Sequence, residues 1–238
     1  MERSIRISVC IPAFNEENSL KEATEELLSA ISSRVKELEV IIVNDGSIDS
    51  TPRIAEQIAK EYSQVKVIHH KRNLGIGACY RDALTLAGGD YFTWFPADHE
   101  NSAEQFIQCL PYLNQDTAVS YYHIGGDNRL FLRRILSRIY IWIINKYFRL
   151  NLKYYNDLTV FPINKLRSFS LVANGSFLFA ESLIKAAKHG CRIIELPTPL
   201  RGREEGNSKT FTFGSLLRMT NDIYRIFMNK LERLGIKR

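Results

Sequence analysis

The sequence lacks the cysteine patterns of a disulfide framework or a structural zinc site. Its 238 residues contain four cysteines, which stand singly, with no CxxC pair and no accompanying histidine cluster. Disulfide-rich secreted domains and zinc-bound modules both depend on such spacing. We therefore expect four buried, reduced thiols in a reducing compartment.

Long apolar runs are also absent. The apolar stretch at 139–144 has six residues, whereas a helix that spans a bilayer needs roughly 20. Behind the first residues there is no apolar segment of the signal-peptide type, so we expect a cytoplasmic protein. Internal repeats, low-complexity segments and clear linkers are missing too, which favours a single domain.

Negative charge is in the minority. The chain has 32 Lys and Arg against 26 Asp and Glu, a formal net charge of +6. This balance suits nucleic acid, acidic lipid headgroups or phosphorylated substrates as partners. Because no nucleic-acid recognition motif accompanies the basic residues, we expect no nucleic-acid partner.

The first hundred residues alternate strand-like and helix-like segments, a pattern that predicts an α/β fold with a mostly parallel sheet. The expected strands are 5–11, 40–43, 65–69 and 91–95, and the expected helices are 17–32, one that begins near 49–52, and 77–87. Beyond residue 100 we expect helices at 103–113 and 179–189, strands at 118–122 and 192–196, and a polar loop at 197–210. We expect helices on both faces of the sheet.

Two further segments are amphipathic. Residues 129–152 combine arginines and lysines with an aromatic, apolar centre, and residues 211–238 alternate leucines and isoleucines with basic residues. Both compositions suit helices that lie in a membrane interface. They equally suit helices that pack on the protein core with a solvated basic edge.

Three short loops follow predicted strands and carry acids: 12–16, 44–47 and 94–100. Acidic turns after strands are common, because Asp and Pro are ordinary turn residues. In open α/β sheets, however, ligands bind beyond the carboxyl ends of the strands. The convergence of three such loops at one edge favours a ligand site there.

Three blocks of sequence, VCIPAFNEENSL, EVIIVNDGSIDST and RNLGIGACYRDALTLAGGDYFTWFPADHE, resemble in order and spacing the family 2 glycosyltransferases, which have the GT-A fold. A later block, GSFLFAESLIKAAKHGCRIIELPTPLRGREEGNSKT, is similar to polyprenyl-phosphate sugar transferases of the dolichyl-phosphate mannose synthase type. The resemblance implies one GT-A domain over 1–238. Its parts would be a nucleotide-binding half (1–100), an acceptor half with a closing loop (101–210) and an amphipathic helix (211–238).

The resemblance implies a metal site in the third loop. Asp98 matches the retained acid of the family's DxD motif, and Glu100 follows where relatives have a polar ligand. Carboxylate oxygens suit Mg²⁺ or Mn²⁺, which would neutralise the departing diphosphate. Pro96 stands where many relatives have the first Asp, so that contact is lost or supplied by Glu100.

The resemblance also assigns the nucleotide-sugar donor its contacts. Pro12, Phe14 and Glu16 would hold the base and ribose. Asp45 would accept hydrogen bonds beside Val43. The backbone around Pro96 and Ala97 would complete the donor pocket, and Arg203 and Lys209 would bind the diphosphate from a closing loop. Arg suits bidentate phosphate contacts and Lys a point-charge contact.

Glu181 matches a position where inverting relatives carry a catalytic carboxylate. An acceptor hydroxyl needs such a general base, whereas a phosphate acceptor is already an anion. A helix-terminal carboxylate without catalytic role is the alternative reading. By resemblance, Arg129, Arg133 and Ser137 would hold a lipid phosphate, and Asp157 begins a motif from which 158–162 departs.

The resemblance therefore implies an inverting glycosyltransferase, peripheral on the cytoplasmic membrane face, that moves a sugar from a UDP- or GDP-sugar to a polyprenyl phosphate. Asp98, Glu181 and Arg203 would be its catalytic residues. One alternative acceptor is a sugar hydroxyl of a surface polysaccharide or glycolipid. A second alternative is an inactive nucleotide-sugar-binding subunit, and a membrane-embedded partner is compatible with each.

Overall fold

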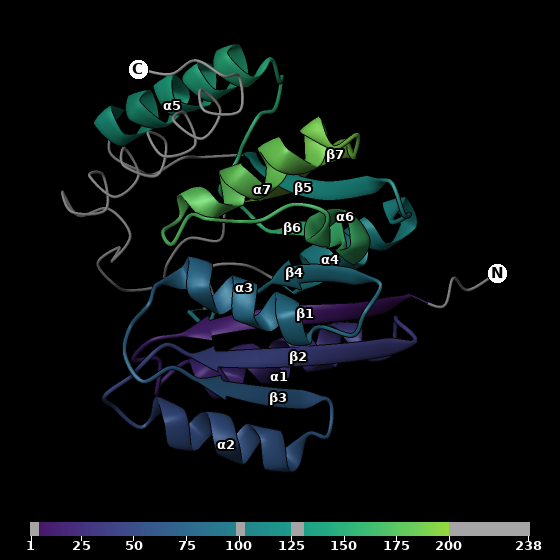
Figure 1. The fold of residues 1–238 in the computed structure, drawn as a ribbon. Coiled ribbons are helices and arrows are strands. Elements are labelled where there is room, and N and C mark those ends of the chain that lie inside the picture. The colour runs from purple at the N-terminus through teal and green to yellow at the C-terminus, as the bar shows by residue number, and fades with distance from the viewer. Residues whose placement is uncertain (1–4, 99–102, 125–130, 200–238) are drawn as a thin grey trace.

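The computed structural model describes residues 5–98, 103–124 and 131–199, with the backbone alone for 131–134 and 136. Within these residues, seven strands form one mixed sheet in the order β3-β2-β1-β4-β6-β5-β7 (Figure 1). The strands are β1 (Arg6–Ala13), β2 (Glu37–Asn44), β3 (Val65–His69), β4 (Tyr91–Trp94), β5 (Thr117–Ile124), β6 (Thr159–Pro162) and β7 (Arg192–Pro199).

Strand direction places most strand ends at one edge. β1 runs parallel to β2 and β4, β2 to β3, and β5 to β7. β6 is antiparallel to both of its neighbours, β4 and β5. Because two reversals cancel, β4 and β5 point the same way, and the carboxyl ends of six strands lie at one edge.

Helices cover both faces of this sheet (Figure 1). They are α1 (Leu20–Ile31), α2 (Thr51–Glu61), α3 (Ile76–Leu86), α4 (Glu104–Cys109), α5 (Phe131–Phe148), α6 (Ile163–Arg167) and α7 (Phe177–Lys188), with a 3₁₀ turn η1 (Leu110–Tyr112). One core lies between the sheet and α1, α2 and α4, and a second between the sheet and α3, α5, α6 and α7.

The central strands supply both cores by alternation. Val40 and Ile42 of β2 enter the first core, whereas Ile41 and Val43 enter the second. Successive side chains of a strand point to opposite faces, so a strand covered on both sides is apolar throughout. All four cysteines are buried and free, as expected.

The predicted α/β class is confirmed, and the expected elements of the first hundred residues lie within a few residues of their predicted bounds. Two predictions are wrong in detail. The loop prediction is wrong for residues 197–199, because β7 continues to Pro199 alongside β5. The α-helix predicted over 103–113 ends at Cys109 and is followed directly by the 3₁₀ turn η1.

β6 and α6 were not predicted from the sequence. β6 has four residues, ends in Pro162, and exists through pairing with β4 and β5. The predicted helix at 211–238 lies outside the described residues. No helix within the described part of the chain has the length and apolarity to cross a membrane.

Candidate active site

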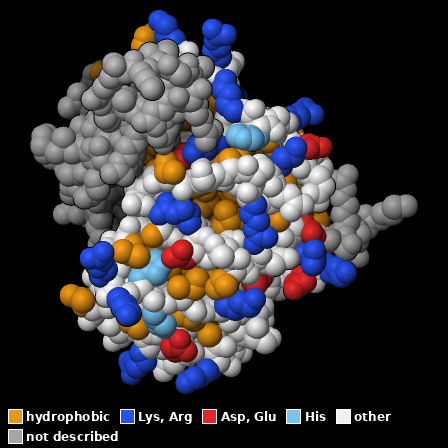
Figure 2. All heavy atoms as spheres, viewed as in Figure 1, with side chains coloured by type: hydrophobic (Ala, Val, Ile, Leu, Met, Phe, Trp, Pro, Cys, Tyr) orange, Lys and Arg blue, Asp and Glu red, His pale blue; other side chains and the backbone are white. Residues whose placement is uncertain are grey.

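The three acidic loops follow β1, β2 and β4, which are neighbours in the sheet and end at its carboxyl edge. The predicted convergence of these loops is therefore present in the structure. Figure 2 shows Lys and Arg side chains over much of one face of the molecule, with fewer acidic groups. This surface suits an anionic ligand.

The first loop is cross-linked to the second. Asn15 adopts a left-handed backbone conformation with φ of 56°. The backbone amide of Asn15 donates to the Ser47 hydroxyl at 3.0 Å, and the backbone amide of Glu16 donates to the Thr51 hydroxyl at 2.8 Å. Phe14 is exposed at this edge, whereas Pro12 is half-buried within β1. An exposed aromatic ring here is available to a flat ligand such as a nucleobase.

Glu16 lies just before α1. Its carboxylate accepts a hydrogen bond from the Ser19 hydroxyl at 2.9 Å, and its carbonyl accepts the amide of Leu20 at 3.0 Å. These contacts support the helix-terminal reading of Glu16, and its assignment to the donor stays a prediction.

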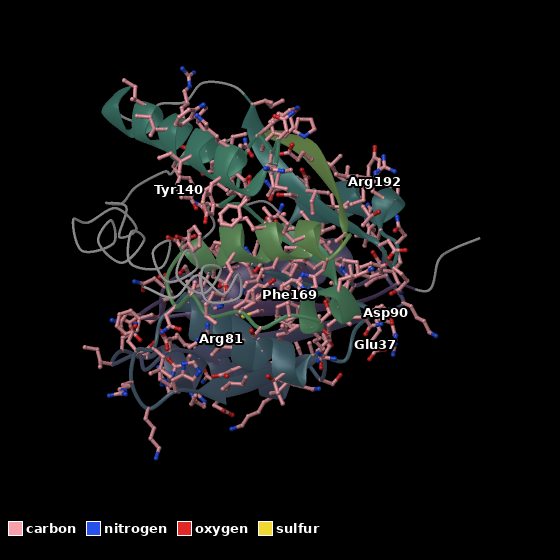
Figure 3. All side chains as sticks on the ribbon, turned by 45° about the horizontal axis from the view of Figure 1, so that its top comes forward. Glu37, Arg81, Asp90, Tyr140, Phe169 and Arg192 are labelled. Carbon is pink, nitrogen blue, oxygen red and sulfur yellow. The ribbon has the colours of Figure 1, made fainter. Side chains whose placement is uncertain are left out.

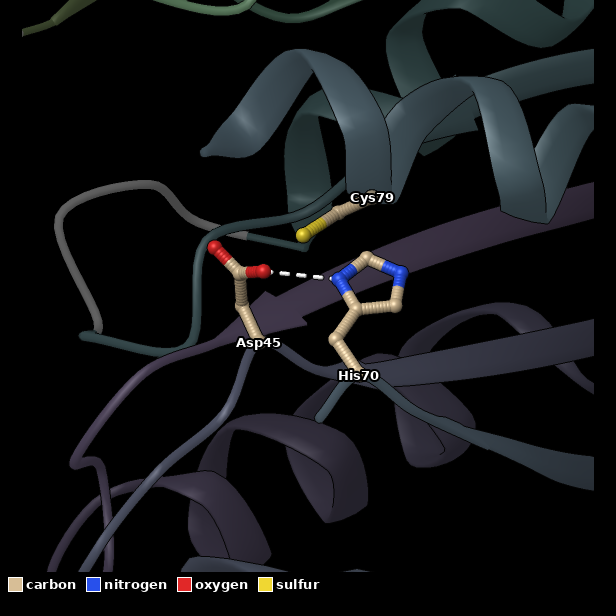
Figure 4. A group of neighbouring side chains, drawn as sticks. All are labelled: Asp45, His70 and Cys79. Atoms are coloured by element: carbon tan, nitrogen blue, oxygen red, sulfur yellow. Dashed lines mark hydrogen bonds and ion pairs between the residues drawn. The ribbon is translucent and has the colours of Figure 1, made fainter. Parts of the chain in front are cut away.

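Asp45 is buried behind the second loop. Its Oδ1 accepts from His70 Nδ1 at 2.7 Å (Figure 4). Oδ1 also accepts from the Leu74 backbone amide at 2.9 Å, and Oδ2 accepts from the Gly75 backbone amide at 2.8 Å. Val43 is fully buried in the second core, and its assignment to the donor stays a prediction. Asp45 therefore fixes the 70–75 segment that leads into α3.

Asp45, His70 and Cys79 place three possible ligand atoms within 4.8 Å of one another (Figure 4). Carboxylate, imidazole and thiolate together suit Zn²⁺ better than Mg²⁺ or Mn²⁺. Burial, followed by the nearby Asp45 carboxylate, raises the pKa of the Cys79 thiol well above its ordinary value. The three groups are thus arranged as a hydrogen-bonded cluster around Asp45.

The third loop emerges from β4. Pro96 and Ala97 are buried and Asp98 is exposed, and Glu100 lies outside the described residues. Trp94, at the end of β4, stacks on Phe179 of α7 with ring centroids 4.4 Å apart. An exposed carboxylate at the sheet edge fits a hard divalent cation.

Glu181 is fully buried in α7. Its carboxylate accepts the amides of Val172 (3.0 Å) and Ala173 (2.8 Å) and pairs with Lys185. Through these contacts Glu181 anchors the 171–174 loop. Its catalytic role stays a prediction. The contacts given above hold the protein backbone at 172–173 and the Lys185 side chain in place.

The 171–174 loop packs in turn on the start of α3. Arg81 donates to the Ala173 carbonyl at 2.7 Å and to the Asn174 side chain at 2.5 Å (Figure 3 labels Arg81). A Cβ at Gly77 would lie 2.1 Å from the Ala173 carbonyl oxygen, so no larger residue fits there. Asp45 and Glu181 therefore lie at two ends of one connected set of contacts.

The outer face of α5 consists of four exposed apolar side chains with two exposed cations among them. These are Ile135, Ile139, Trp142 and Ile143, with Arg138 and Lys146. Lys146 Nζ lies 4.9 Å from the centroid of the Trp142 ring. The opposite side of the helix enters the second core through Ile144 and Phe148. α5 is thus apolar on two sides.

The remaining predicted residues have no described side chains, with one exception. Arg129, Arg203 and Lys209 lie outside the described residues, as does the predicted polar loop 200–210, and only the backbone of Arg133 is described. Ser137 is half-buried on α5. Their assignments to the acceptor and the diphosphate stay predictions.

Sequence reasoning missed a polar group beneath α5. His123 lies in β5, one residue before its end, and its Nε2 is 3.4 Å from the buried carboxylate of Asp157. Among the residues that the structure describes, His123 Nδ1, the Tyr140 hydroxyl and the Asn156 amide oxygen are buried and have no hydrogen-bond partner (Figure 3 labels Tyr140). Buried polar groups of this kind take up water or ligand hydroxyls. Only the fold brings these scattered residues together.

The fold defines an α/β protein in which the loops after β1, β2 and β4 meet at the carboxyl edge of the sheet. The model of the family described as "Glycosyl transferase family 2" matches residues 8–175. The chain therefore belongs to glycosyltransferase family 2.

Curated relatives are glycosyltransferases. Glycosyltransferase AglD of Haloferax volcanii is 25% identical over 98% of this chain and 39% of its own length. Dolichyl-phosphate beta-glucosyltransferase ALG5A of Trichomonas vaginalis is 31% identical over 43% of this chain and 33% of its own. The chain spans 19 to 39% of the length of the curated relatives it matches.

A solved structure confirms the GT-A fold. Glucosyl-3-phosphoglycerate synthase from Mycobacterium tuberculosis, in complex with Mn²⁺, UDP-glucose and phosphoglyceric acid, superposes with a TM-score of 0.66. It is 19% identical and covers 98% of this chain and 81% of its own. At this identity the likeness establishes the fold alone.

Proposed function

We propose that this protein transfers a sugar from a UDP- or GDP-sugar to a polyprenyl phosphate, with inversion at the anomeric carbon. The observation that carries the proposal is the convergence of the β1, β2 and β4 loops at the carboxyl edge of a family 2 sheet.

The metal would be held by Asp98 and Glu100. Asp98 is exposed at the site edge, and its oxygen ligands fit Mg²⁺ or Mn²⁺. The ion supplies positive charge to the diphosphate as it leaves. The relative of known structure is in complex with Mn²⁺ and UDP-glucose, which supports the same ion type here.

A phosphate acceptor makes a general base unnecessary. One phosphate oxygen would form the new bond to the anomeric carbon while the bond from that carbon to the donor diphosphate breaks, and the nucleoside diphosphate leaves with the electron pair. Arg203 and Lys209 would stabilise this leaving group, and Arg129, Arg133 and Ser137 would hold the acceptor phosphate. The structural contacts of Glu181 agree with a reaction that needs no base.

The outer face of α5 supports a lipid acceptor at a membrane surface. Its exposed isoleucines and Trp142 suit the acyl boundary, and its cations suit anionic headgroups. Beside it lies a hollow of about 600 Å³, whose lining includes Arg138, Lys146 and Lys153. We propose that α5 holds the protein on the cytoplasmic face, where a membrane-embedded partner would also be accessible.

A sugar hydroxyl is the second candidate acceptor. The buried polar groups of His123, Tyr140 and Asn156 favour it, because they offer hydrogen bonds to a hydroxylated ligand. In this case Glu181 would serve as the base. An inactive nucleotide-sugar-binding subunit is the third candidate, suggested by Pro96 in place of an acid.

One experiment separates these candidates. The protein is incubated with Mn²⁺, a panel of UDP- and GDP-sugars, and either dolichyl and undecaprenyl phosphate or a glycolipid acceptor. A new phosphate-linked glycolipid is the expected result. Transfer only to hydroxyls supports the second candidate, and donor binding without transfer or hydrolysis supports the third.

A further inference from the structure

His70 lies directly after β3, at the same sheet edge as the three acidic loops. Its side chain is only 6% exposed. Nδ1 is 2.7 Å from Asp45 Oδ1, and Nε2 is 3.0 Å from Asp82 Oδ2 on α3. The buried His70 ring thus lies between two carboxylates, a contact that none of the predicted site roles includes.

Hydrogen-bond chemistry fixes what each group does. An ionised carboxylate only accepts, so Nδ1 of His70 donates to Asp45, and Nε2 donates to Asp82 when the ring carries both protons. The ring therefore joins Asp45, which is 5% exposed, to Asp82, which is 52% exposed. Charge-assisted bonds of this kind are stronger than neutral ones, and the buried member contributes most.

Asp45 is left with little freedom. Oδ1 accepts from His70 and Leu74, and Oδ2 accepts from Gly75. A carboxylate offers about four acceptor positions, and these three contacts together with the nearby Cys79 thiol take up most of them. Without His70, the carboxylate keeps the two backbone donors, which belong to the segment that it must itself hold in place.

The 70–75 segment packs closely against the loop that carries Asp45, so the loss of the His70 hydrogen bond would affect both. Gly46, beside Asp45, has φ of 72°, and a Cβ there would lie 2.4 Å from the Arg72 carbonyl carbon. Gly75 has φ of 91° and begins α3. The orientation of Asp45 and the path of the 70–75 segment therefore depend on each other.

We infer that His70 is a positioning residue of the donor site, which orients the Asp45 carboxylate for the nucleoside part of the nucleotide-sugar through its Nδ1 donor. The inference rests on the proposed function for the identity of the ligand. The bond from Nε2 to Asp82 holds the ring in place and is secondary.

Two neutral variants separate the two ring nitrogens. The side-chain amide of Asn places a donor near the position of Nδ1, and that of Gln places one near Nε2. His70→Asn keeps the Asp45 contact, whereas His70→Gln keeps the Asp82 contact. Both replace the ring by a neutral amide, so any difference between them reports on which hydrogen bond matters.

Calorimetry with UDP and GDP in Mn²⁺ measures donor-nucleotide affinity. We expect His70→Asn to bind within about twofold of the unaltered protein and His70→Gln to bind about tenfold more weakly, the loss of one charge-assisted bond. His189 provides the matched control, because it is exposed at the end of α7 and its Nδ1 lies 2.8 Å from the Lys185 carbonyl oxygen. His189→Asn and His189→Gln should both bind as the unaltered protein does.

Equal weakening in the two His70 variants would overturn the inference, because a merely structural histidine makes no such distinction. Amide hydrogen exchange at Leu74 and Gly75 reads the same contact without nucleotide, and it should be faster in His70→Gln than in His70→Asn. Equal exchange in both would also overturn the inference. If the unaltered protein binds neither nucleotide, the proposed function is refuted instead, whatever the exchange result.

Discussion

Replacement of Glu181 by Gln tests whether this carboxylate anchors the structure. Glu181 is fully buried and accepts hydrogen bonds from two backbone amides and from Lys185. A Gln side chain has one acceptor oxygen, and its amide nitrogen would face a donor. One or two charge-assisted bonds are lost, each worth about 1.5–3 kcal/mol.

The expected loss of unfolding free energy is therefore about 3 kcal/mol. For a chain of this size, such a loss lowers the melting temperature by roughly 6–12 °C. Calorimetric and urea-induced unfolding would measure it. Glu61→Gln is the control, because Glu61 forms an exposed pair with Lys21 at 3.2 Å, and such pairs contribute about 0–1 kcal/mol.

An unchanged melting temperature for Glu181→Gln would refute the anchoring role. The turnover of the Glu181→Gln variant also tests whether Glu181 is the general base. Loss of turnover with intact stability and donor binding identifies Glu181 as the base for a hydroxyl acceptor. Retained turnover in a less stable protein supports the phosphate acceptor, which requires no base.

Three further predictions concern metal binding, the loss of stability at low pH and binding to membranes. Asp98→Asn should lower turnover at least roughly 100-fold and abolish the effect of Mn²⁺ on donor affinity; equal Mn²⁺ dependence would contradict the metal assignment. Arg6 holds the pKa of Asp90 below its ordinary value, mainly through their hydrogen bond at 2.7 Å. The stability that Asp90 contributes is therefore present above its unfolded pKa of about 3.9 and lost as pH falls through the lower folded value. The urea midpoints of unaltered and Asp90→Asn protein should accordingly differ at pH 6 and converge toward pH 2; a constant gap would contradict this pair. Trp142→Ser should reduce sedimentation with anionic vesicles about tenfold, because Trp142 is 60% exposed on the outer face of α5. Tyr112→Ser, exposed on η1, should leave it unchanged.

The sequence predicted the parallel half of the sheet because its patterns are local. Val40–Val43 is short, apolar and β-branched, which is typical of a strand covered on both faces. The strand-end acids around Asp45 and Asp98 followed from the same argument about sheet edges. β6 was missed because four residues ending in Pro162 carry no such pattern, and their partners are far away in the chain.

The sequence could also not predict the hydrogen-bond partners of the site residues. Asp45 was expected to face the donor, but most of its acceptor positions bind protein groups 25 to 30 residues away. Glu181 was expected near the reaction, but it anchors a loop against α3. Residue type and position in the chain indicate charge and family, but not which groups a carboxylate meets after folding.

By itself, then, the sequence determined the family, through the blocks that resemble it, and the α/β class, because local periodicity encodes the elements. The site at the carboxyl edge of the sheet stays a prediction. Tertiary structure alone decided the rest. It brought His70 between Asp45 and Asp82, joined the 171–174 loop to α3, and gave α5 an exposed apolar face. These features depend on contacts between distant segments, and only the packed chain specifies their geometry.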